Sequence, residues 1–282
     1  MGHGETVGEM NTPIVVVTSC SAQGWKSYGM RFLDTFHRFW PQTIELFVVS
    51  EDPILLPQSI TSRRKVTFLS LWQLSPKALG FHQRHQTNHK ARGLDAPDSV
   101  KKHGYSFRHD AYKFSKKVFA IDLVANQLQG TQRLIWLDAD VVTHSPVPGD
   151  MFLELPPYGL ALAYLDRGKF HSECGFVGYN LEHEATRPFI AEFTRLYDSD
   201  AVFALEEWHD SWVFDMVRRR LGTPSYPIPY RGAITHPFVY SVLGQYMDHL
   251  KGARKQRGVS HDHPKYRRDR QTFRGRGKVT FA

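Results

Sequence analysis

Two carboxylates stand one residue apart directly after an apolar run in "RLIWLDADVVTHSPVP", residues 133–148. The run "LIWL" predicts a buried strand, which places Asp138 and Asp140 where that strand ends. Side chains alternate along a strand, so both carboxylates would point to one side, with Cα atoms roughly 7 Å apart. Two like charges this close both stay ionised only beside a compensating positive charge.

A divalent cation is the natural compensation. Mg²⁺ and Mn²⁺ prefer oxygen ligands and keep positions open for a substrate diphosphate, so the spacing suits an ion that neutralises a leaving phosphate. Far downstream, "GQYMDHLKGARKQRG" offers the imidazole of His249 as a third ligand, and Lys251 and the backbone of Gly252 as phosphate contacts. Taken alone, Asp-x-Asp is also common as a turn at the end of a strand.

Strands and helices alternate along the chain. Apolar runs rich in β-branched residues predict strands, and apolar residues spaced three or four apart predict helices. Strands are expected at 13–20, 44–52, 65–71, 134–137, 159–165 and 174–180, and helices at 24–41, 110–128, 186–197 and 206–222. This alternation predicts an open α/β sheet with helices on both faces, in which ligands bind beyond the carboxyl ends of the strands.

The composition bounds the class of protein. The 282 residues, 41% of them hydrophobic, are enough for one sizeable core, and no apolar run approaches the ~20 residues that span a bilayer. The first residues, "MGHGETVGEMNTP", lack the pattern of a secretory signal. Cys20 and Cys174 have no metal-like spacing, so we expect two reduced thiols in a cytoplasmic protein.

The net charge of +8 is concentrated near the C-terminus. Residues 251–278 carry eleven Lys or Arg and two Asp, which leaves the remainder of the chain at about −1. We therefore expect an N-terminal extension (1–11), a near-neutral domain (12–252) and a basic tail (253–282). Such a tail suits nucleic acid or an anionic membrane surface, or is a solvated end that aids solubility.

The segment 76–107 interrupts the alternation of strands and helices. It is rich in His, Lys and Arg and has no clear apolar period, which predicts a long basic surface loop or an ordered insertion. Loops of this length inside a domain are usually functional or mobile.

The motifs together resemble one enzyme family. "LIWLDADVV" resembles the D-x-D segment of GT-A type glycosyltransferases, which use nucleotide sugars, and "YMDHLKG" is similar to their C-terminal His motif. "HSECGFVGYN" resembles the segment that lines the sugar and acceptor pocket, and "EEWHDSWVFDMV" the helix that brings an acidic residue to the active site. The resemblance covers roughly residues 12–252. It implies a Rossmann-like α/β/α sandwich around a mainly parallel mixed sheet.

The resemblance also implies a set of ligands. Asp138, Asp140 and His249 would hold Mn²⁺ or Mg²⁺, and Lys251, with Gly252, would bind the β-phosphate of a nucleotide-sugar donor such as a UDP-sugar. The nucleoside would lie at the ends of the first two strands, near Thr18, Ser19, Glu51 and Asp52. On the helix before the metal strand, Lys113 or Lys117 would stabilise the diphosphate, unless this pair is a solvated face.

Sugar transfer with inversion needs a base for the acceptor hydroxyl. Asp210, in "WHDSW" at the start of a predicted helix, is the first candidate, because a helix N-terminus favours the ionised carboxylate. Glu173 and Asp166 are further candidates. The alternative for Asp210 is an ordinary charge at a helix start, and a retaining reaction strictly requires no protein base.

The acceptor is indicated by the basic segments. Lys and Arg of the tail and of 76–107 could neutralise phosphates, with Tyr266 and Phe273 stacking on bases. The chain resembles phage and kinetoplastid GT-A enzymes that attach sugars to hydroxymethylated DNA bases, which implies a hydroxymethylated pyrimidine in DNA as acceptor and, for a phage enzyme, the host cytoplasm. Alternatives are a glycan, lipid-linked sugar or protein acceptor, a nucleotidyltransferase, and a non-catalytic nucleic-acid-binding protein.

Overall fold

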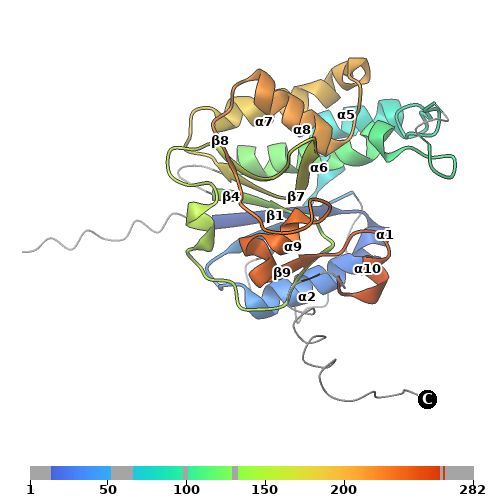
Figure 1. Cartoon of the computed structure of the whole chain (residues 1–282). Coiled ribbons are helices and arrows are strands. Elements are labelled where there is room, and N and C mark those ends of the chain that lie inside the picture. The colour runs from blue at the N-terminus through green and yellow to red at the C-terminus, as the bar shows by residue number, and fades with distance from the viewer. Residues whose placement is uncertain (1–13, 52–65, 98–100, 129–132, 261–262, 264–282) are drawn as a thin grey trace, which may run out of the picture.

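The computed structural model describes residues 14–51, 66–97, 101–128, 133–260 and 263. Seven strands form one sheet in the order β3-β2-β1-β4-β7-β6-β8 (Figure 1). Strand β7 runs antiparallel to β4 and β6, and the other neighbouring strands are parallel. The predicted α/β class with a mainly parallel mixed sheet is confirmed. The strands are β1 Ile14–Cys20, β2 Glu45–Ser50, β3 Val66–Ser70, β4 Arg133–Leu137, β6 Leu162–Arg167, β7 Phe170–Asn180 and β8 Ser225–Pro227.

Helices cover both faces of this sheet. Successive side chains of a strand point to opposite faces, so Val15 and Val17 of β1 join one core while Ile14 and Val16 join the other. In Figure 1, one group of helices lies above the sheet and a smaller group lies below it. The upper group is α5 Pro76–His85, α6 Ala111–Gln127, α7 Thr186–Asp198 and α8 Asp210–Arg220, and the lower group includes α2 Met30–Phe39 and α9 Pro237–Tyr240.

The helix expected at 24–41 is present but contains an irregular turn. Helix α1 (Ala22–Gly24) leads through a π-helical turn (η1, Trp25–Gly29) into α2. Phe32, Phe36 and Trp40 stack in series in the core below the sheet. Such π-helical turns occur frequently at functional sites, and Tyr28 of this turn lines the large cavity described below.

The segment 76–107 is ordered where it begins, so a long loop is wrong for its first third. Pro76 opens α5, and the hydroxyl of Ser75 accepts a hydrogen bond from the amide of Ala78. Ala78 and Phe81 are buried against the upper core. The sequence gives only a weak helical signal here, because few apolar residues stand among many polar and basic ones. The interpretation as an ordered insertion agrees with this helix.

A second, two-stranded sheet lies outside the main one. Strand β5 (Val141–Thr143) follows β4 closely and pairs antiparallel with β9 (Met247–His249). Beyond it, the short helix α10 (Arg254–Arg257) packs on the domain, where Arg31 Nη1 donates to the carbonyl of Lys255 at 3.0 Å. The folded chain thus continues past the predicted boundary at residue 252. The extension 1–11 and most of the basic tail, including Tyr266 and Phe273, lie outside the described residues.

Both cysteines, Cys20 and Cys174, are buried free thiols, as the sequence predicts. Within the described residues, no helix combines the length and apolar character needed to cross a bilayer.

Replacement of Phe36 by Ala should destabilise the domain strongly. Its ring is fully buried between two other aromatic rings, and such truncations cost about 3–5 kcal/mol. Chemical denaturation would measure the loss. The control is Arg38→Ala on the same helix, where an exposed ion pair with Asp34 contributes below about 1 kcal/mol. Equal effects of the two replacements would contradict the packing described here.

Candidate active site

The turn after β4 carries the two carboxylates of the D-x-D motif. Asp138 and Asp140 follow the end of β4, and the paired strands β5 and β9 place His249 opposite Val141. His249 Nε2 lies 3.1 Å from Asp140 Oδ1 and 3.3 Å from Asp138 Oδ2. The three residues offer ligand atoms within 4.8 Å of one another. The structure therefore brings together the three side chains that the sequence proposes as metal ligands.

Glu173 fixes the orientation of the imidazole. Its Oε1 lies 2.7 Å from His249 Nδ1, so Nε2 faces the Asp pair. Gly175, two residues along β7, leaves room for this ring, because a Cβ there would lie 2.3 Å from His249 atoms. Glu173 was a candidate base, but its carboxylate is fully buried against His249 and the ammonium of Lys251 (2.9 Å). This geometry fits an orienting role behind the imidazole better than that of a base.

Two lysines neutralise the Asp pair. Lys117 Nζ lies 3.0 Å from Asp138 Oδ1 and 2.7 Å from Asp210 Oδ2, and it also donates to the carbonyl of Cys174. Lys255 Nζ lies 2.8 Å from Asp140 Oδ2. The sequence pointed to Lys117 but not to Lys255, which was assigned to the tail. The sequence feature that could have indicated Lys255 is its position six residues after His249, on the short helix α10.

These contacts shift the protonation equilibria of the site. Burial would raise the pKa of Asp138, but the ammonium of Lys117 and hydrogen bonds from His249 and Trp136 outweigh it, and the pKa lies well below its usual range. Burial would lower the pKa of His249, but the carboxylate of Asp140 and hydrogen bonds to both Asp residues raise it well above its ordinary value. At neutral pH the two Asp side chains are therefore carboxylates and the His249 ring between them is an imidazolium.

The site opens into a cavity of about 1150 Å³. The lining comes from the carboxyl ends of β1, β2 and β4, from α6, and from the segments around β7, α8 and β9. It includes Asp138 and Asp140, while His249 is buried and is not among the lining residues. This is the edge at which open α/β sheets bind ligands, as the sequence predicts for the Asp pair. The volume suits a ligand of nucleotide-sugar size.

Some of the other predicted site residues line the cavity, and others do not. Ser19, Glu51, Lys113, Asp210, Lys251 and Gly252 line the cavity. Glu51 is paired with Lys116 at 2.5 Å, and the ammonium of Lys113 lies over the ring of Phe114 rather than at the Asp pair. Thr18 is buried and is not among the lining residues, and Asp52 lies outside the described residues.

Asp210 and Asp166 differ clearly as candidate bases. Asp210 is the first residue of α8, as predicted, and its buried carboxylate lies at the cavity wall beside Lys117. Asp166 lies near the end of β6, where it accepts a hydrogen bond from the amide of Gly168, and it does not line the cavity. The geometry therefore favours Asp210 over Asp166.

Comparisons with known proteins give structural matches only. No family model and no curated protein matches the sequence. The apo structure of mouse xyloside xylosyltransferase 1 matches with 12% identity over 77% of this chain and 84% of that one, with a TM-score of 0.46. Two structures of the glycosyltransferase GlyE from Streptococcus pneumoniae TIGR4 match with 12% and 10% identity over 76% and 77% of this chain, with TM-scores of 0.45 and 0.44. This chain matches 45% of the GlyE chain, which is under half its length. At these values the likeness carries no argument about activity, which has to be inferred from the site.

Divalent-ion binding should strengthen as the pH rises. The raised pKa of His249 means that its imidazole is protonated in the metal-free protein, and it must lose this proton to bind an ion. Below that pKa, the affinity for Mn²⁺ should rise by up to about tenfold per pH unit. Calorimetric titration between about pH 6 and pH 8, in buffers of different ionisation enthalpy, measures both affinity and proton release. A pH-independent affinity, or one that keeps its slope in His249→Gln, would contradict this geometry.

Proposed function

We propose that the chain is a metal-dependent glycosyltransferase that moves a sugar from a nucleotide-sugar donor to an acceptor hydroxyl. The observation that carries this proposal is the convergence of Asp138, Asp140 and the buried His249, with both carboxylates at the wall of a large cavity. Two carboxylates and one imidazole fit a divalent ion, and the imidazole favours Mn²⁺ over Mg²⁺. When bound, the ion would neutralise the negative charge that develops on the leaving diphosphate.

The lysines beside the Asp pair suit the phosphates of the donor. Lys117 and Lys255 each contact a carboxylate of the pair. With an ion held by these oxygens, Lys255 would turn to phosphate oxygens, while Lys117 would keep its contact with Asp210. Lys251 is paired instead with Glu173, behind His249. We therefore assign the β-phosphate contact to Lys255, with the backbone of Gly252 close by in the lining of the same cavity.

The nucleoside and the sugar fit different parts of the cavity. Ser19 and Glu51 follow the ends of β1 and β2 and line the cavity, so they would contact the nucleoside, with a UDP-sugar as the first donor to test. Asp210 lies across Lys117 from the Asp pair, which supports a place beside the sugar. In an inverting reaction its carboxylate would accept the proton of the acceptor hydroxyl, and in a retaining reaction it would position the sugar.

Asp140→Asn should reduce the release of nucleoside diphosphate from the donor by more than about 100-fold, because the ion loses a ligand. Lys255→Ala should reduce it by roughly 10- to 100-fold through the lost phosphate contact. The assay is a screen of nucleotide sugars with Mn²⁺ that separates nucleoside diphosphate from pyrophosphate. Asp150→Asn, an exposed position outside the cavity, is the matched control.

Two outcomes would overturn the assignment. Release of pyrophosphate would identify a nucleotidyltransferase, which also uses paired carboxylates. Full activity of Asp140→Asn would remove the metal site from the mechanism.

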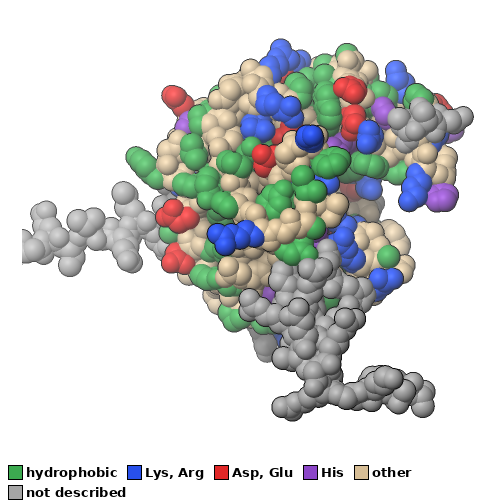
Figure 2. Space-filling view, viewed as in Figure 1, with side chains coloured by type: hydrophobic (Ala, Val, Ile, Leu, Met, Phe, Trp, Pro, Cys, Tyr) green, Lys and Arg blue, Asp and Glu red, His purple; other side chains and the backbone are tan. Residues whose placement is uncertain are grey.

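For the acceptor, we propose a hydroxymethylated pyrimidine in DNA. On the face shown in Figure 2, Lys and Arg of the described residues are scattered among acidic and hydrophobic side chains and form no continuous basic patch. Support comes instead from the cavity lining, which contains the cations Arg92 and Lys113 and the aromatic residues Tyr105, Phe107 and Phe114. Cations for phosphates and rings for stacking are the elements of a single-stranded or flipped-out nucleotide site.

Hydroxymethylated DNA should stimulate donor turnover by at least about tenfold, because a positioned hydroxyl replaces water as nucleophile. The stimulation should fall as salt rises, since phosphate contacts release counterions. DNA of the same sequence without the hydroxymethyl group is the control, and Arg92→Ala should weaken the effect. If a glycan or protein stimulates donor turnover and modified DNA does not, the acceptor is that glycan or protein and not DNA.

A further inference from the structure

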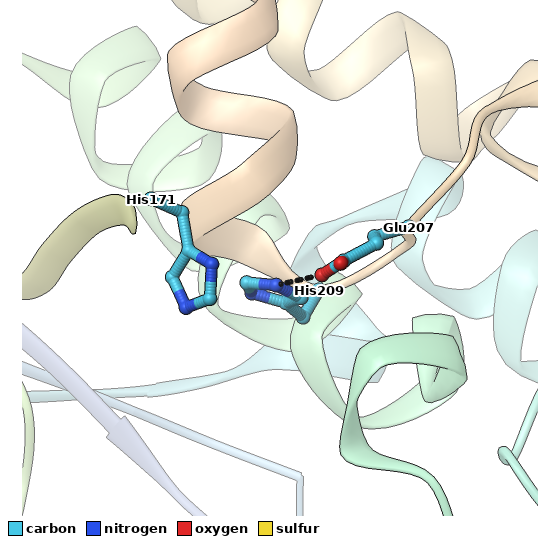
Figure 3. Close-up of side chains that lie close together, drawn as sticks. All are labelled: His171, Glu207 and His209. Carbon is cyan, nitrogen blue, oxygen red and sulfur yellow. Dashed lines mark hydrogen bonds and ion pairs between the residues drawn. The ribbon is translucent and has the colours of Figure 1, made fainter. Parts of the chain in front are cut away.

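A second cluster of metal-ligating side chains lies beside the first. His171, Glu207 and His209 offer ligand atoms within 4.8 Å of one another, and none of them has a role in the sugar transfer described above. His171 belongs to β7, Glu207 to the connection between η5 (Ala201–Ala204) and α8, and His209 directly precedes α8. Figure 3 shows the ring of His209 between the ring of His171 and the carboxylate of Glu207.

The cluster is held together by close contacts. His209 Nε2 lies 2.9 Å from Glu207 Oε2, and the ring centroids of His171 and His209 are 4.4 Å apart. The side chain of His209 is 3% exposed and that of Glu207 12%. Ligands of a tetrahedral zinc ion lie roughly 3.4 Å apart, which follows from bonds of about 2.1 Å. Small rotations of side chains already in contact would therefore complete such a set.

The surroundings resemble the outer shell of a metal site. Arg108 Nη1 donates to Glu207 Oε1 at 3.1 Å, which orients the carboxylate and leaves Oε2 toward His209. Phe107 and Phe114 flank the ring of His209, with centroids 5.5 and 5.8 Å away. Hydrogen-bonded ligands set in a partly apolar shell are typical of protein metal centres.

The two clusters differ in the ion they suit. Asp138, Asp140 and His249 supply mainly carboxylate oxygens, which suit Mg²⁺ and Mn²⁺. The second cluster supplies two imidazoles and one carboxylate, a ligand set found in zinc sites that keep one position open. Both of its imidazoles line the large cavity, so an open position there is accessible to a water or a ligand.

From this geometry, we propose that His171, Glu207 and His209 form a second divalent-metal site, specific for zinc-like transition metals. The site is adjacent to the first: His171 lies two residues before Glu173 on β7, and His209 directly precedes Asp210. The proposal does not rest on sugar transfer, because the ligand set is complete without a donor.

Zinc stoichiometry tests the site. Titration of the full chain against a chromophoric zinc chelator should show that Asp140→Asn, which removes a ligand of the first site, still binds one equivalent of Zn²⁺. Adding His171→Ala or Glu207→Gln to this variant should abolish that equivalent. Adding His89→Ala, at an exposed histidine that is not part of the cluster, should leave it unchanged.

X-ray absorption at the zinc edge supplies a readout that needs no substitution within the second cluster. Zinc bound to the folded Asp140→Asn chain should show two imidazole nitrogens and at least one oxygen. A failure of Asp140→Asn to bind zinc while its thermal melting stays like that of the wild type would overturn the proposal. Zinc binding that survives both His171→Ala and Glu207→Gln would overturn it equally, because the ion would then lie elsewhere.

Discussion

The mutual repulsion of Asp138 and Asp140 is the constraint around which the site is built. Two carboxylates in a turn at the end of a buried strand are stable only beside positive charge, and the protein supplies it from three directions. Lys117 comes from the helix above the sheet, His249 from the small sheet β5–β9, and Lys255 from α10. Segments more than a hundred residues apart are therefore held at one point by electrostatic attraction as well as by packing.

The same charges explain how a metal-free site can be ready for an ion. The protonated imidazole and the two ammonium groups occupy the carboxylate oxygens that a divalent ion would take. In the proposed metal-bound state, the ion would bring two positive charges, His249 would give up one proton, and Lys255 would be released for the negatively charged phosphates. Glu173 is buried and bonds the opposite ring nitrogen, so it would stay the partner of His249 if an ion bound.

Local sequence patterns predicted six of the seven strands of the main sheet, all but β8, and the three side chains that converge after β4. Strands β1, β2 and β4 are continuous apolar runs, α6 has a clear helical period, and Asp-x-Asp after a buried strand marks the ligand-binding edge. Except for α5, the features that were missed depend on pairings between distant segments, which no local pattern encodes. Strand β9 has three residues and forms only against β5, and α5 shows few apolar residues among basic ones. The places of Glu173 behind His249 and of Lys255 on Asp140 follow from the same long-range pairing.

The most direct test of the central claim is pulsed electron paramagnetic resonance of Mn²⁺ bound to the protein in the presence of a nucleoside diphosphate. Coordination by His249 predicts a ¹⁴N coupling to the manganese, lost in His249→Gln, together with a ³¹P coupling from the diphosphate. Bound Mn²⁺ that shows no nitrogen coupling, or a coupling unchanged in His249→Gln, would contradict the shared site of Asp138, Asp140 and His249.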